Sequence, residues 1–185
     1  MLQTQEKEYE YEKEQDFSGD FSAMQTFTSL YRSPIGPLTI VVSHHHLKEI
    51  RFSGESKHEH PPATPLLQEV IAQLDAYFNR SLRVFDLPLA PEGTPFQQKV
   101  WQALLQVPYG HTASYRDIAL AVGNPKATRA VGGANGRNPI PIVIPCHRII
   151  ASDGSLGGYS AGLERKTWLL KHEGVQLPDS AKARF

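Results

Sequence analysis

Residues 114–135 read SYRDIALAVGNPKATRAVGGAN, and this stretch decides the fold of the second half of the chain. Ser114, with an acidic residue three positions later, has the spacing of a capping box and predicts a short helix that stops at Gly123. Asn124 and Pro125 are typical of the start of another helix, which the pattern extends to about residue 135. Two short helices joined by a tight, glycine-containing turn predict a helix-turn-helix unit.

The second of these helices carries few of the side chains that read bases in the major groove. Such helices usually present Arg, Asn, Gln or Lys to base edges, whereas this one is mainly Ala and Gly around a single arginine, Arg129. Small residues allow close approach to a minor groove, where Arg129 could enter the base stack as a wedge. They serve equally well in a helix packed against its own core, and the segment alone favours that interpretation.

The first half predicts a small α/β domain. Three short runs rich in β-forming residues, separated by turn-forming residues, predict an antiparallel meander. These runs are residues 27–31, 38–42 and 47–52. Thr64 and Pro65 are an N-cap and first-turn pair, and they begin a helix with a continuous apolar face. The triple histidine His44-His45-His46 could bind a metal, but consecutive side chains on a turn diverge, so a solvated hairpin tip is preferred.

A proline-rich linker, residues 87–93, divides the chain, and the charge balance changes sign there. Residues 1–92 hold 8 Lys and Arg against 14 Asp and Glu, while residues 93–185 hold 11 against 5. The second half is basic enough to lie near phosphates, although an ordinary uneven surface explains the numbers equally well. Capping signals at Thr94 predict a helix after the linker, and Ser160 precedes a last helix that Gly174 closes. We expect a disordered acidic tail at 1–24, an α/β domain at 25–91, a helix-turn-helix domain at 92–176 and a tail at 177–185.

The composition excludes several classes of protein. With 40% hydrophobic and 21% charged residues among 185, the chain is neither wholly disordered nor too short for a core. Its apolar runs fall short of the roughly 20 residues of a membrane span, and its polar start predicts no signal peptide. One cysteine can form neither an internal disulfide nor a multi-cysteine zinc site. We therefore expect a cytoplasmic protein, or a nuclear one in a eukaryotic host.

That cysteine lies in the most informative stretch of the chain, residues 140–150, which read IPIVIPCHRII. A lone cysteine is most often a small buried hydrophobe. Here Cys146 stands beside a histidine and an arginine, and such neighbours lower a thiol pKa and favour a nucleophilic thiolate. If the stretch is an apolar strand, Cys146 and His147 point to opposite faces, and a link between them needs a water or an irregular backbone. Glu173 could orient the histidine as the third member of a relay.

Two further segments flank this stretch. Asn138 lies in a turn, where its amide could brace neighbouring backbone groups, although a plain loop is the simpler interpretation. Residues 154–160 are rich in glycine but lack the spacing of a phosphate-binding loop. A flexible flap over a pocket is the interpretation that suits them.

Taken together, these segments resemble the O6-alkylguanine-DNA alkyltransferase family, the methylated-DNA–protein-cysteine methyltransferases. The resemblance covers nearly everything from residue 95 to residue 174 and is weaker over the first domain. An ordered series of short motifs carries it, and the series is far more specific than any one of them. The motifs are Pro108-Tyr109-Gly110, Ser114-Tyr115, Gly123-Asn124-Pro125, Arg129-Ala130-Val131-Gly132, Ala134-Asn135, Asn138-Pro139-Ile140, Pro145-Cys146-His147-Arg148, Gly157-Gly158-Tyr159-Ser160 and Lys171-His172-Glu173-Gly174.

The resemblance implies an α/β N-terminal domain with a ribonuclease-H-like antiparallel sheet and helix. A mainly helical, winged helix-turn-helix domain follows. It also implies DNA repair by direct transfer of an alkyl group from O6-alkylguanine, and from O4-alkylthymine, to a cysteine after base flipping. Because a thioether has no easy hydrolytic exit, each molecule reacts once. No cofactor and no metal are expected.

The resemblance also implies roles for individual residues. Cys146 attacks the alkyl carbon, His147 takes the thiol proton through a water, and Glu173 orients that histidine. Asn138 braces the site, and Tyr115 assists proton donation to the departing guanine.

Tyr159 is expected in the pocket wall, and Ser160 is expected to bind the O6 region. Arg129 is expected to intercalate where the base has left, which favours the wedge interpretation. The remaining expected DNA contacts are Ala127, Thr128, Ala130 and Gly132.

The implied partner is double-stranded DNA that contains O6-alkylguanine, bound by a monomer that could also bind cooperatively. Three other functions remain open on the sequence. A binding-only relative would lack the reactive cysteine, and a transcriptional regulator would show a longer-armed recognition helix. A cysteine hydrolase with a Cys-His-Glu relay would turn over an ester or amide.

Overall fold

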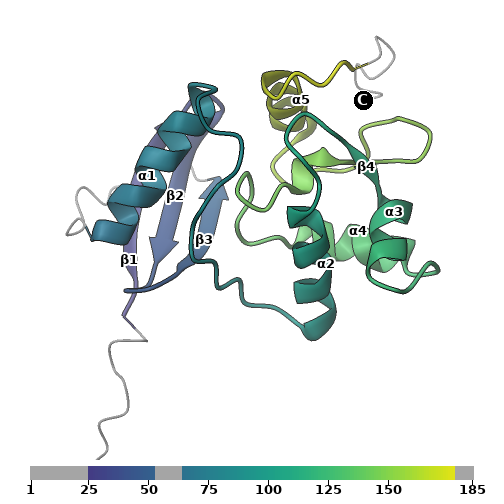
Figure 1. The fold of residues 1–185 in the computed structure, drawn as a ribbon, viewed down its shortest axis with the longest axis horizontal. Helices are drawn as coiled ribbons and strands as arrows, with labels where there is room; N and C mark the ends of the chain where they lie inside the picture. Colours follow the sequence, from purple (N-terminus) through teal and green to yellow (C-terminus); the bar gives the residue numbers. More distant parts are fainter. Residues whose placement is uncertain (1–24, 53–63, 178–185) are drawn as a thin grey trace, which may run out of the picture.

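The computed structural model describes residues 25–52 and 64–177, and its elements fall into two groups (Figure 1). We refer to the first group as the N-terminal domain and to the second as the C-terminal domain. The N-terminal domain comprises β1 (Phe27–Ser33), β2 (Gly36–Val42), β3 (Leu47–Phe52) and α1 (Pro65–Phe78). The C-terminal domain comprises α2 (Pro95–Leu105), β4 (Ala113–Ser114), α3 (Tyr115–Ala121), α4 (Thr128–Gly136), the 3-10 helix η2 (Cys146–Arg148), β5 (Ile149–Ile150) and α5 (Leu163–His172).

The N-terminal domain is an antiparallel sheet of order β1-β2-β3 with α1 against one face. A tight turn pairs Ser33 with Gly36, and alternate residues of β2 are buried beneath α1. Thr64 caps α1 by accepting a hydrogen bond from Leu67, and Pro65 occupies its first turn. The Tyr31 hydroxyl donates to Asp75 at 2.7 Å and so ties sheet to helix. The predicted meander and helix are confirmed.

The C-terminal domain is mainly helical, and two capping boxes define its first helices. Thr94 and Ser114 each accept a hydrogen bond from the third helical residue, whose side chain bonds back to the cap. α2, α3 and α4 pack together, and the indole nitrogen of Trp101 on α2 donates to the carbonyl of Ala134 on α4 at 2.9 Å. The predicted helix-turn-helix unit therefore forms, in a domain of the expected class.

The predicted cap of α4 is wrong. The helix begins at Thr128, with Ala127 at its N-cap and no side-chain capping bond, rather than at Asn124 and Pro125. The carbonyl of Asn124 instead accepts from the amide of Ala127 at 2.9 Å and closes a separate turn. Gly123, which has a φ of +77°, turns the chain just before it.

The predicted apolar strand around Cys146 is also wrong. Only β5 is a strand, and it pairs in parallel with β4. Cys146 begins the 3-10 helix η2, and Pro141 and Pro145 lack the amide protons that a continuous ladder needs. Ile142, a β-branched residue, has a φ of +76°, so the approach to the cysteine is a strained, irregular turn.

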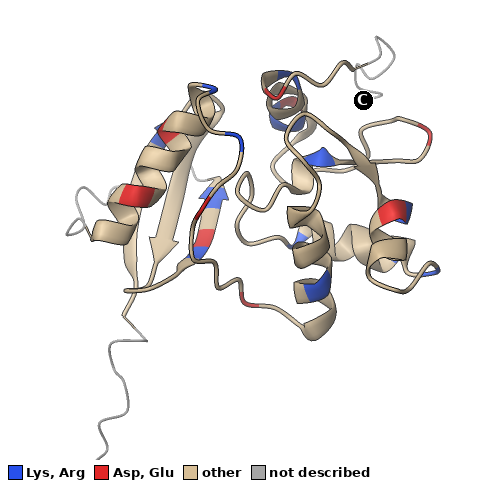
Figure 2. Cartoon of the chain, viewed as in Figure 1, with Lys and Arg blue, Asp and Glu red and all other residues tan. Residues whose placement is uncertain are grey.

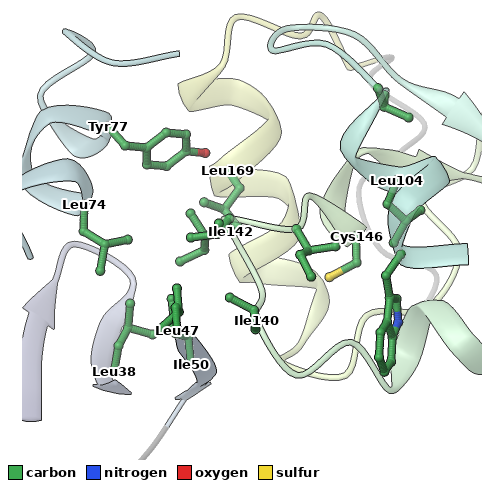
Figure 3. Packing of buried hydrophobic residues seen from close by; sticks show 14 of the residues in the cluster. Leu38, Leu47, Ile50, Leu74, Tyr77, Leu104, Ile140, Ile142, Cys146 and Leu169 are labelled. Carbon is green, nitrogen blue, oxygen red and sulfur yellow. The ribbon is translucent and has the colours of Figure 1, made fainter. Parts of the chain in front are cut away.

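The two domains share one hydrophobic core. Ile140 and Ile142 lie between Leu47 and Ile50 of β3 and the segment that carries Cys146 (Figure 3). The amide of Ile50 donates to the carbonyl of Pro139 at 2.9 Å across this contact. Arg165 on α5 donates to the carbonyl of Ile35 in the β1–β2 turn at 2.8 Å. The loop before Cys146 is therefore held from both domains.

Parts of the predicted organisation lie outside the described residues, namely the acidic tail at 1–24 and nearly all of the tail at 177–185. The tip His44-His45-His46 is exposed, and the His44 ring contacts Phe27 edge-on. Within residues 25–52 and 64–177, no group of three or more potential ligands is placed to hold a metal ion. No helix in those ranges combines the length and apolar character that crossing a membrane requires.

We expect Thr94→Ala to lower the free energy of unfolding by about 1 kcal/mol, because it removes one half of a capping box. Urea denaturation followed by circular dichroism measures this change. Thr94→Ser, which keeps the capping oxygen, is the matched control and should unfold within a few tenths of a kcal/mol of the wild type. An equal loss in both variants would contradict the capping role.

Candidate functional site

Cys146 lies at the centre of the candidate site and is only 3% exposed. Asn138, which precedes it by eight residues, donates from Nδ2 to the carbonyl of Ile144 at 2.7 Å. The Oδ1 atom of Asn138 accepts from the amide of Ile140 at 3.0 Å. Asn135 on α4 donates to the carbonyl of Cys146 itself at 3.3 Å. Two asparagine side chains thus hold the backbone on both sides of the thiol.

The surroundings of the thiol act on its pKa in opposite directions. Burial raises the pKa of Cys146, while the Asn138 amide, the charge of Lys166 and the Tyr159 hydroxyl lower it. The raised pKa keeps the resting group largely a thiol at neutral pH. Attack by Cys146 therefore needs a base that can accept its proton.

His147, the next residue in η2, is fully buried and was expected to act as that base. Its Nε2 atom lies 2.9 Å from Oε1 of Glu173, so in the neutral ring Nε2 carries the proton and donates it to the carboxylate. The Nδ1 atom is buried without a partner in the described part of the chain. Burial lowers the pKa of His147, and Glu173 opposes this shift. The geometry offers one free basic nitrogen on a neutral imidazole.

Glu173, the C-cap of α5, is the most heavily bonded group of the site. Arg148 donates to it from Nε at 2.8 Å and from Nη2 at 3.0 Å, and Gly110 donates its amide at 3.3 Å. The Tyr77 hydroxyl donates at 2.8 Å from α1. Burial would raise the pKa of Glu173, but His147 and Arg148 outweigh it and lower this pKa to about 2. The carboxylate is therefore a permanent negative charge at physiological pH.

Lys166 brings a buried cation to the same region. Its Nζ donates to the carbonyl of Ile149 at 2.5 Å, to the carbonyl of Leu156, and to that of Gly158 at 3.4 Å. Burial lowers the pKa of Lys166 to about 8, and the neighbouring Cys146 opposes the shift. The ammonium both favours a thiolate and fastens the glycine-rich segment to β5.

That segment forms one wall beside the thiol. The ring of Tyr159 is partly exposed but its hydroxyl is buried, and Ser160 beside it is exposed. Tyr115, at the start of α3, donates to the carbonyl of Gly158 at 3.4 Å, and its pKa is raised by burial and by Cys146. Gly157 has a φ of +63°, and a Cβ there would lie 3.0 Å from the Tyr115 hydroxyl. Only glycine fits this close approach without displacement.

α4 presents one buried face and one exposed face. Val131, Ala134 and Asn135 pack inward, whereas Arg129 and Ala130 are exposed. Ala127, Thr128 and Gly132 are half-buried between these faces. Lys and Arg also occur on α2 and around the α3–α4 connection (Figure 2). The inner face of the helix packs against the core as one interpretation expected, and Arg129 on the exposed face leaves the wedge interpretation a prediction.

Sequence reasoning anticipated some of these residues and overlooked others. The structure brings Asn138, Tyr159 and Tyr115 to the Cys146 thiol and joins Glu173 to His147, the residue that follows the cysteine. Ser160 is exposed beside Tyr159. Arg129 and its neighbours on α4 lie on a separate, exposed surface. The overlooked members of the site are Tyr77, Asn135 and Lys166. Arg148 was expected to act on the thiol, but it bonds Glu173 instead. A signal existed for Lys166, which falls on the apolar face of α5 with Leu163, Leu169 and Leu170 at helical spacing.

Comparison with known families matches both domains. Residues 95–175 match the family model described as 6-O-methylguanine DNA methyltransferase, DNA binding domain. Residues 26–91 match that described as 6-O-methylguanine DNA methyltransferase, ribonuclease-like domain. The two matches together span most of the chain.

Individual proteins agree with the family models. A methylated-DNA–protein-cysteine methyltransferase of Methanosarcina acetivorans is 48% identical over 153 residues, covering 80% of this chain and 98% of that protein. One of Haemophilus influenzae is 41% identical, covering 86% and 94%. The crystal structure of Mycobacterium tuberculosis O6-methylguanine methyltransferase superposes with a TM-score of 0.73 at 43% identity, covering 84% and 96%. M. tuberculosis OGT in complex with DNA gives 0.71 at 46% identity, covering 78% and 90%. The chain therefore belongs to the O6-alkylguanine-DNA alkyltransferase family, the methylated-DNA–protein-cysteine methyltransferases.

Proposed function

We propose that this protein repairs DNA by transferring the alkyl group of O6-alkylguanine to the sulfur of Cys146. The observation that carries the proposal is the chain's single cysteine, buried beside a neutral histidine that a carboxylate orients. The names of the relatives and the family models support the same reaction. The presence of Cys146 separates this chain from a binding-only relative.

The chemistry begins with loss of the thiol proton. The free Nδ1 of His147 receives that proton through a water, and Glu173 stabilises the imidazolium that forms. The charge of Lys166 favours the thiolate. The sulfur then attacks the alkyl carbon in line, so that an S–C bond forms as the C–O bond breaks and its electron pair stays with the guanine.

The departing guanine needs a proton or a strong hydrogen bond at once. Tyr115 is the proposed donor, because it stands beside Cys146 at the start of α3. Tyr159 forms the pocket wall, and Ser160 binds the O6 region. The product is a thioether, which water does not cleave, and Cys146 has no second thiol to pass the group to. Each molecule therefore acts once, without a cofactor.

The burial of Cys146 requires that the base come to the protein. A thiol that is 3% exposed cannot reach an O6 atom inside a stacked duplex, so the guanine is flipped out into the site. Arg129 then fills the space that the base leaves, as the exposed long side chain on a helix of small residues. Ala127, Thr128, Ala130 and Gly132 permit the close approach of α4 to the DNA.

Three further properties belong to the proposal. O4-alkylthymine is a second substrate, since it offers the same alkyl–oxygen bond to the thiolate. The protein acts as a monomer that can bind DNA cooperatively. It works in the cytoplasm, or in the nucleus of a eukaryotic host, where reducing conditions keep an acceptor thiol free.

Intact-protein mass spectrometry after incubation with a duplex carrying one O6-methylguanine tests the reaction directly. The wild type should gain one methyl group per molecule, and Cys146→Ala should gain none while it binds the duplex with nearly unchanged affinity. An undamaged duplex is the control. Methylation of Cys146→Ala would show that the acceptor lies elsewhere, and tight binding without any mass change in the wild type would favour a binding-only protein.

Arg129→Ala tests the proposed wedge. We expect this variant to repair duplex O6-methylguanine about tenfold more slowly, because roughly 1.4 kcal/mol of support for the extrahelical base is lost. Its reaction with free O6-benzylguanine should stay close to that of the wild type, since that substrate needs no flipping. Arg129→Lys separates charge from shape. Equal losses on the two substrates would contradict an intercalating role.

A further inference from the structure

The N-terminal domain reaches the relay of the C-terminal domain through one side chain, Tyr77. This tyrosine is fully buried in the last turn of α1, and its hydroxyl points away from its own sheet toward α5 (Figure 3). The hydroxyl donates to Oε1 of Glu173 at 2.8 Å, across 96 residues of sequence. The rings of Tyr109 and His172 contact the Tyr77 ring, and His172 also hydrogen-bonds the Tyr77 carbonyl at 2.9 Å. Tyr77 is therefore held in place independently of the carboxylate.

The Oε1 atom that Tyr77 contacts is the one that orients His147. It accepts from the Tyr77 hydroxyl at 2.8 Å, from Nε2 of His147 at 2.9 Å and from Nη2 of Arg148 at 3.0 Å. Oε2 is held separately, by Nε of Arg148 and the amide of Gly110. Three donors on one oxygen divide its negative charge, so each bond depends on the other two.

We propose that Tyr77 is a positioning residue of the alkyl-transfer site: its hydroxyl withdraws negative charge from Oε1 of Glu173 and thereby keeps His147 a neutral base. The inference rests on the proposed role of His147 as the acceptor of the thiol proton. A buried tyrosine needs some partner for its hydroxyl, and a backbone carbonyl would satisfy that need. Here the partner is the carboxylate that faces the base, which gives the hydroxyl an effect on the chemistry as well as on packing.

The other charges around His147 set the direction of the effect. Its neighbours are Glu173 and Lys166 from α5, Arg148 and Cys146 from η2, and Tyr77 and Tyr109 beyond the carboxylate. Burial, Arg148 and Lys166 lower the pKa of His147, and Glu173 raises it. Removing the Tyr77 hydroxyl leaves more negative charge on Oε1 and strengthens the contribution of Glu173. The pKa of His147 then rises.

The expected consequence appears on the acid side of the pH–rate profile. Transfer requires neutral His147, so the rate increases with pH through the pKa of this residue and then levels off, until loss of the Lys166 charge at still higher pH lowers the rate of the wild type and of the variant alike. In Tyr77→Phe the acid limb should move to higher pH by roughly half to one unit. At the acid end, transfer should then be about three- to tenfold slower than in the wild type, and near pH 9 the two rates should coincide.

Single-turnover transfer from a saturating O6-methylguanine duplex, measured from about pH 5 to about pH 9, provides this test. Tyr31→Phe is the matched control: it removes another tyrosine–carboxylate hydrogen bond of the same domain, at 2.7 Å to Asp75, and this bond involves neither Glu173 nor His147. Its profile should superpose on that of the wild type. Melting temperatures and DNA affinities of both variants, measured alongside, report on folding and binding.

The possible profiles distinguish the role of Tyr77 from that of His147. A Tyr77→Phe rate that is unchanged, reduced equally at every pH, or shifted to lower pH overturns the proposal, and so does an equal shift in Tyr31→Phe. His147→Gln, which lacks the titrating ring, should react slowly with no acid limb. If His147→Gln keeps the wild-type profile, the base assignment itself fails. If His147→Gln loses the acid limb while Tyr77→Phe keeps the wild-type profile, the base assignment stands and only the proposed role of Tyr77 is contradicted.

Discussion

The buried carboxylate of Glu173 is the group on which the rest of the structure depends. It accepts hydrogen bonds from three parts of the chain: from α1, from the α2–β4 connection and from η2. A buried carboxylate is costly unless its oxygens are fully bonded. The requirement to satisfy one charge therefore fixes where the N-terminal domain stands, how η2 is oriented, and which nitrogen of His147 is free.

Other contacts besides those of Glu173 also join the two domains. Apolar packing of Ile140 and Ile142 against β3 joins the two domains, but such contacts tolerate sliding and repacking. Hydrogen bonds are directional and tolerate much less displacement. The Ile50–Pro139 and Arg165–Ile35 hydrogen bonds set the register of the interface. The first of these bonds lies at the start of the loop that leads to Cys146, so domain packing and the position of the thiol are linked there.

Local signals in the sequence predicted most of the fold. The helix caps at Thr94 and Ser114 and the three β-rich runs of the meander depend on neighbours within a few residues, and these predictions are confirmed. The errors came where local signals compete. Asn124-Pro125 resembles a helix start, yet a separate turn uses the Asn124 carbonyl. The apolar run before Cys146 resembles a strand, yet its prolines lack the amide protons for the hydrogen bonds of a sheet. Ile142, with a positive φ, turns the chain there.

The site was predictable only in part, for the same reason. Cys146, His147 and Asn138 lie close together in sequence. Glu173 was a candidate for the relay that spacing alone could not establish and that the family resemblance then implied. Tyr77 contacts Glu173 across 96 residues, and Arg148 reaches the carbonyl of Val107 across 41. The periodicity of apolar residues in the sequence does not predict such long-range hydrogen bonds, because each one depends on how whole helices and loops pack together.

Lys166 has a consequence for which lesions the protein can accommodate. Its ammonium binds carbonyls of β5 and of the glycine-rich segment from inside the protein, where no water can replace those bonds cheaply. The position of the glycine-rich segment beside the thiol is thus set from inside the protein. Room for a larger adduct would have to come from a change at Lys166 and the turns that it restrains, and not only from changes at the residues that face the damaged base.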